Sequence, residues 1–153
     1  MTKPLDERPG PAELGELALV ISAVIEGAVV GLWLAFLPSL ALRVGGFPAA
    51  PVFFVRWAGA LHLTLAAGYA LEWSRFRRVT LLVLAKAITT VFLVVIWGSD
   101  GLPVLMMLAT FLEGTMACLG QILRGPAEQS RHARARLRLV TPAPTEVRPA
   151  RFR

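Results

Sequence analysis

Residues 79–98 read VTLLVLAKAITTVFLVVIWG, a run of twenty residues whose one charged side chain is Lys86. An α-helix of this length rises about 30 Å, which matches the hydrocarbon thickness of a bilayer. Ionisable residues are costly inside a membrane and usually serve packing or function there. The segment therefore predicts a membrane-spanning helix with an important lysine in its interior.

Three other apolar segments of similar length accompany this one, at 17–37, 52–71 and 102–123. The short connections between them contain prolines, glycines and charged residues, so neighbouring helices should run antiparallel. Barrel strands would be shorter and would alternate in polarity. A composition that is 56% apolar, with a mean hydropathy of +0.62, is typical of such proteins. We predict an all-α integral membrane protein, an antiparallel four-transmembrane-helix bundle with up-down-up-down topology over 17–123.

Two polar segments flank the predicted bundle. Residues 1–16 form an N-terminal segment, and residues 124–153 hold eight arginines and two glutamates, which equals the net charge of +6 for the whole chain. Arginines and prolines without apolar periodicity predict a disordered tail. Because it directly follows a span, we expect the Arg-rich tail to contact anionic lipid headgroups and no nucleic acid.

The basic residues also predict the orientation, because cytoplasmic segments accumulate Lys and Arg. Arg75, Arg77 and Arg78 lie in the second connection, on the same side as the tail. An even number of spans brings the N-terminal segment to that side too. We therefore expect both termini in the cytoplasm and the protein in a bacterial inner membrane.

The predicted helices also carry ionisable residues inside their apolar segments. We estimate the depth of each residue in the membrane from the helical rise per residue. Four of these residues lie at a similar depth, and a fifth lies nearer the outer end of the second span. The predicted intramembrane polar layer consists of Glu26, His62, Lys86, Glu113 and Arg56. Small residues share a helical face with the two glutamates, so we expect this layer to face the bundle interior.

Two interpretations of the polar layer stay open. In the structural one, Lys86 pairs with a carboxylate: Glu113 is the expected partner because a short turn joins the third and fourth helices, and Glu26 is the alternative. In the functional one, the layer is a proton path, because two carboxylates accompany one lysine and one histidine. His62 is then either a hydrogen-bonded core residue or a member of a proton relay.

The sequence favours a protein without catalysis of its own. It has none of the common nucleophile, phosphate-loop or zinc-protease motifs, so we predict no catalytic residues. The Glu-x-x-His spacing of carboxylate metal sites is absent, and Cys118 is the one cysteine. Haem held by two histidines would need a second buried histidine. We therefore expect no metal and no resident cofactor.

A family resemblance rests on several short motifs distributed over 17–123. They are Phe36-Leu37-Pro38, Arg56-Trp57-Ala58-Gly59, Gly68, Asp100-Gly101-Leu102-Pro103 and Glu113. With these motifs the chain resembles the DoxX-like superfamily of small four-helix bacterial membrane proteins. The resemblance implies an accessory role in membrane redox or envelope complexes, with quinone as a candidate ligand. Lys86 departs from the family pattern.

These observations lead to three function hypotheses. The first is an accessory or structural subunit, or an envelope-stress component, embedded in the lipid bilayer as a homo-oligomer or within a larger membrane complex. The second is a proton-coupled transporter or channel for a small solute, which would act as a homo-oligomer. The third is a quinone-interacting redox subunit, and it rests on the family resemblance.

Overall fold

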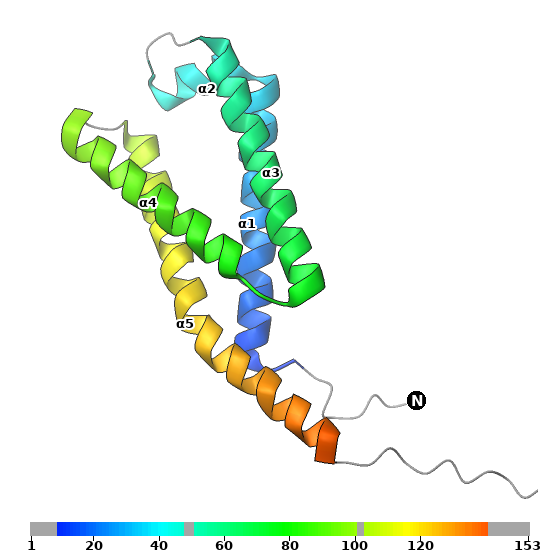
Figure 1. Cartoon of the computed structure of the whole chain (residues 1–153). Coiled ribbons are helices and arrows are strands. Elements are labelled where there is room, and N and C mark those ends of the chain that lie inside the picture. Colours follow the sequence, from blue (N-terminus) through cyan, green and yellow to red (C-terminus); the bar gives the residue numbers. More distant parts are fainter. Residues whose placement is uncertain (1–8, 48–50, 101–102, 141–153) are drawn as a thin grey trace, which may run out of the picture.

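The computed structural model describes residues 9–47, 51–100 and 103–140. All regular secondary structure in these residues is helical, as predicted from the sequence. The helices in chain order are α1 (Pro11–Phe36), α2 (Pro38–Gly45), α3 (Val52–Phe76), α4 (Thr80–Asp100) and α5 (Val104–Val140) (Figure 1).

Helices suited to crossing a membrane account for most of the described chain. Three segments are long and apolar enough: Pro11–Phe36, Thr80–Gly98 and Met106–Arg136. Helix α3 has 25 residues but is not among them, because Arg56, His62 and Glu72 dilute its apolar residues. The protein is therefore a multi-pass membrane protein.

The long helices pack as two pairs, α1 with α3 and α4 with α5, and α1 also contacts α5 (Figure 1). Glycines permit the close approach of α1 to α3. A Cβ atom on Gly59 would lie 2.6 Å from the backbone nitrogen of Ala35, and one on Gly31 would lie 2.9 Å from the carbonyl oxygen of Gly59. Small residues at helix contacts are typical of membrane proteins, in which packing replaces the hydrophobic effect.

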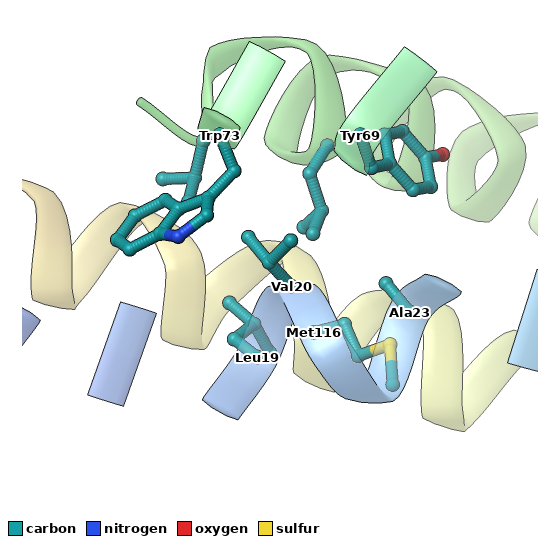
Figure 2. Close-up of a cluster of buried hydrophobic side chains, with 8 residues drawn as sticks. Leu19, Val20, Ala23, Tyr69, Trp73 and Met116 are labelled. Carbon is teal, nitrogen blue, oxygen red and sulfur yellow. The ribbon is translucent and has the colours of Figure 1, made fainter. Parts of the chain in front are cut away.

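The apolar core lies toward the end of the molecule where α1 begins. Figure 2 shows Leu19, Val20 and Ala23 of α1 beside Tyr69 and Trp73 of α3, with Met116 of α5 against them. Val79 and Leu82 complete this buried cluster. The core therefore joins α1, α3, α4 and α5 at one end.

Helix α1 begins six residues before the predicted boundary at residue 17. Pro11 occupies its first turn, where the missing N–H costs nothing, and the backbone N–H of Gly10 donates to a carboxylate oxygen of Glu13 at 3.3 Å. These local features start the helix in a segment that composition alone assigns to the polar N-terminus.

Helix α2 occupies part of the predicted first loop. It begins at Pro38, directly after α1, and ends at Gly46, whose φ of 71° lies in the left-handed region that glycine adopts at little cost. Pro38 therefore ends one helix and begins the next.

Helix α5 extends well beyond the predicted span. The sequence predicts disorder from residue 124, but the structure continues the helix through Pro126 to Val140. Alanine, arginine, glutamate and glutamine are strong helix formers, and ion pairs to α1 hold this extension in place. The remainder of the predicted tail, 141–153, lies outside the described residues.

Candidate functional site: a buried lysine between two carboxylates

Lys86 of α4 is the centre of a buried ionic group. Its Nζ atom donates to Oε2 of Glu26 on α1 at 2.7 Å and to Oε1 of Glu113 on α5 at 2.8 Å. The exposed fractions of the side chains are 7% for Lys86, 21% for Glu26 and 10% for Glu113. We call these three residues the Lys86 triad. The triad joins three helices at one point.

The Lys86 triad carries more negative than positive charge. Two carboxylates share one ammonium, so the group has a formal charge of −1 when all three side chains are ionised. Each carboxylate contacts the same nitrogen, which brings the two acidic groups close to each other. Excess charge of this kind is expensive in a poorly solvated interior, and binding one proton or another cation would neutralise it.

Short hydroxyl side chains lie around the Lys86 triad. The Oγ1 atom of Thr90 donates to the carbonyl oxygen of Lys86 at 2.7 Å, one turn along α4. Thr110, one turn before Glu113, is buried and donates to the carbonyl oxygen of Met106. Both hydroxyls are bound to their own helix, so the strong partners of Lys86 are the two glutamates.

The other two residues of the predicted polar layer have different environments. The Nδ1 atom of His62 lies 2.8 Å from the carbonyl oxygen of Ala58 on its own helix. Arg56 is exposed and, with Arg43 and Ser39, lines a separate cavity of about 570 Å³ between α2 and α3. The structure thus brings together Glu26, Lys86 and Glu113, but places His62 and Arg56 in no direct contact with them among the described residues.

A second ionic group, which the sequence prediction did not include, joins the start of α1 to the extension of α5. Nη2 of Arg131 donates to Oε2 of Glu16 at 2.8 Å, and Nη2 of Arg134 donates to Oε1 of Glu13. We call these the α1–α5 ion pairs. Glu16 is fully buried, and its Oε1 atom makes no hydrogen bond to the described residues. These pairs fix the first turns of α1 against α5.

A sequence signal for the α1–α5 ion pairs exists. Glu13 and Glu16 are three residues apart, as are Arg131 and Arg134, so each pair of like charges occupies one face of its helix. The signal is visible only once both flanking segments are recognised as helical. If the two flanking segments are taken as polar termini, the three-residue spacing has no helical meaning, and the pairing of the glutamates with the arginines is not predicted.

Among the residues that the structure describes, no group of three or more His, Cys, Asp or Glu side chains could hold a metal ion. Cys118 is exposed on α5. The Lys86 triad is therefore the candidate site, and its geometry suits the holding and exchange of charge.

Comparison with known proteins gives no match: no family model, no curated protein and no solved structure resembles this chain closely enough to count. The resemblance to the DoxX-like superfamily stays a prediction. Functional inference therefore rests on the geometry of the described residues.

Proposed function

We propose that the protein is a non-catalytic, multi-pass subunit of the bacterial inner membrane, a four-helix bundle that acts as an accessory or structural component. One observation carries the proposal: the three carboxylates that are buried among the described residues, Glu13, Glu16 and Glu113, are each bound by a cation from a different helix. The polar side chains inside the bundle thus bind one another, and their combined effect is to hold helices together.

Ionic contacts between buried side chains of different helices suit a helix bundle in lipid. Apolar side chains gain little from leaving lipid for a helix contact, so close packing and polar contacts between helices must provide the association energy. The Lys86 triad supplies polar contacts between α1, α4 and α5, and the glycines of α1 and α3 supply the close packing.

The proposed topology counts α3 as the fourth span. Its 25 residues are long enough, and Arg56 and Arg75 lie near its two ends, where long side chains can reach the membrane surface. Helices α1 and α5 meet at one end of the molecule through the α1–α5 ion pairs. The basic residues Arg75, Arg77 and Arg78 lie at the end of α3, which supports a cytoplasmic location for that side.

A stripe of exposed apolar side chains on α4 is the surface that we propose for assembly into a homo-oligomer. Leu84, Ile88 and Val91 are exposed and recur at helical spacing on one face. Helix α4 diverges from α3 beyond their connection (Figure 1). The exposure of the three side chains shows that no other described helix covers this stripe. We propose that α4 of a second copy packs on it.

Cysteine cross-linking in native membranes tests this assembly. In a Cys118→Ser background, Ile88→Cys should form disulfide-linked dimers on mild oxidation, whereas Val29→Cys, on an exposed face of α1, should not. Native mass spectrometry in mild detergent should show a homo-oligomer. A monomer in the mass spectrum together with equal cross-linking of both variants would contradict the proposal.

A second candidate function, proton-coupled transport as a homo-oligomer, is favoured by the surplus carboxylate of the Lys86 triad. A purely structural pair needs one carboxylate, while the triad contains two beside one ammonium. In proteoliposomes with an internal pH dye, wild type should pass protons and Glu113→Gln should not. Glu128→Gln, which changes an exposed ion pair on the same helix, is the matched control. Equal flux in wild type and Glu113→Gln would exclude this function.

A further inference from the structure

A cavity of about 710 Å³ lies where the start of α1, the end of α3 and the extension of α5 meet. Its volume falls in the range of small-molecule sites. The walls combine apolar side chains, three arginines and one carboxylate, among them Leu14, Leu17, Trp73, Arg77, Arg131, Arg134 and Glu13. The cavity is separate from the Lys86 triad and shares no residue with it.

The charges around this cavity leave a positive excess. Arg131 is paired with Glu16 and Arg134 with Glu13, so these two guanidinium groups are balanced. Arg77 has no carboxylate partner among the described residues. Its guanidinium carbon lies 5.6 Å from the centre of the Trp73 ring. The cavity therefore offers one cation without a carboxylate partner in the described part of the chain, beside the guanidinium of Arg131, whose five N–H donors exceed its two hydrogen bonds to Glu16 and Arg77.

The backbone of Arg77 is fixed in a conformation that few side-chain-bearing residues adopt. Its φ of 52° ends α3 in the left-handed region, and its N–H donates to the carbonyl oxygen of Trp73 at 3.0 Å. Its carbonyl oxygen accepts a hydrogen bond from Nη1 of Arg131. The turn is thus attached to α5, and its side chain is held at the cavity wall.

The apolar wall of the cavity lies next to its cationic wall. Leu14 is half exposed, Leu17 is partly buried, and the indole of Trp73 is packed in the core. Tryptophan and arginine side chains gather at the headgroup level of membranes, with apolar residues toward the acyl chains. A ligand that fits must join an anionic group to an apolar chain.

We propose that this cavity binds the phosphate headgroup of an anionic phospholipid from the surrounding membrane. The phosphate oxygens contact the guanidinium of Arg77, with additional N–H donors from Arg131, and one acyl chain lies against Leu14 and Leu17. This binding site is independent of the subunit and transport functions proposed above.

Thermal unfolding of the full chain in detergent tests the site with defined probes. Adding dioleoylphosphatidylglycerol should raise the melting temperature, whereas dioleoylphosphatidylcholine and inorganic phosphate should not. Arg77→Gln should weaken binding about tenfold, as expected for losing one charge-assisted contact. Arg75→Gln removes an exposed arginine from the same end of α3 without altering the cavity, and should bind like wild type.

Three outcomes would overturn the proposal. If phosphatidylcholine raises the melting temperature as much as phosphatidylglycerol, the headgroup is not recognised. If inorganic phosphate alone gives the full effect, the site binds a free anion and not a lipid. If Arg75→Gln weakens binding as much as Arg77→Gln, the attraction is a general property of the basic surface. Melting temperatures without lipid give the baseline for each variant, so a folding defect is separated from a binding defect.

Discussion

The α1–α5 ion pairs and the Lys86 triad both consist of glutamates bound by basic side chains, but the ratio of carboxylates to cations differs between them. In both, at least one glutamate of α1 meets a cation that comes much later in the chain. At the end of the bundle each glutamate has its own arginine, and the guanidinium groups keep exposed fractions of 25% and 28%. Inside the bundle one lysine with a 7% exposed side chain serves two glutamates.

The charges of the α1–α5 ion pairs are thus balanced, whereas those of the Lys86 triad are not. The α1–α5 ion pairs need nothing further for neutrality, and their arginines reach solvent. The Lys86 triad has an extra carboxylate in a place that solvent hardly reaches, so its stability depends on the single ammonium. The buried, unbalanced group should therefore be the more sensitive to substitution.

The largest effect is expected for Lys86→Met. Removing the ammonium leaves two carboxylates together in a poorly solvated site, and breaking a buried pair in this way costs about 3–5 kcal/mol of the free energy of unfolding. Unfolding in detergent micelles measures the loss. Ile122→Met, on an exposed face of α5 outside the proposed α4 contact, is the control and should be nearly neutral.

Adding Glu113→Gln to Lys86→Met should recover part of the loss, because replacing both members of a buried pair is often close to neutral. Recovery should be larger in the triple variant that also contains Glu26→Gln, since Lys86 binds both glutamates. A double-mutant cycle measures the coupling between positions. Strictly additive losses would show that the three residues do not interact.

The Lys86 triad was predictable only in part. The short connection between α4 and α5 makes these helices neighbours, and this indicates Glu113 as a partner of Lys86. The role of Glu26 as a second, simultaneous partner depends on how α1 is rotated against α4 and α5. That rotation is set by packing, such as the close approach of Leu123 on α5 to Gly15 on α1, and depth along a helix does not reveal it.

The α1–α5 ion pairs were not predicted from the sequence for a different reason. Pro126 and the arginines after it read as the start of a disordered tail, and Glu13 and Glu16 read as part of a polar terminus. The helical conformation of each segment is stabilised by contact with the other. Long-range contacts of this kind override local signals, and the spacing of the charges becomes informative only once both segments are recognised as helical.

The two α1–α5 ion pairs should differ in strength. Arg131→Gln leaves Glu16 fully buried without its cation, and we expect a loss of about 2–3 kcal/mol in the free energy of unfolding. Arg134→Gln should cost less, about 1 kcal/mol, because Glu13 keeps the hydrogen bond from the backbone N–H of Gly10, whereas Oε1 of Glu16 makes no hydrogen bond to the described residues. Both losses can be read from unfolding in detergent. Equal losses would show that the burial of Glu16 does not determine the strength of its pair.

The smallest effect is expected for Arg124→Gln. Arg124 and Glu128 form a pair one turn apart on α5, with exposed fractions of 38% and 41%. Exposed pairs contribute little and are screened by salt. The melting temperature of this variant should match that of wild type in high salt. A large loss that persists in high salt would mean that this end of α5 packs against something beyond the described contacts.

The order of the charges along the chain has a consequence for biosynthesis. Glu26 is 60 residues ahead of Lys86, and Glu16 is 115 residues ahead of Arg131. At ribosomal rates of about 5–20 residues per second, α1 is made on the order of ten seconds before its last partner. Helix α1 is therefore made with its acidic side chains lacking their cations, and its final position is fixed only when α5 has been made.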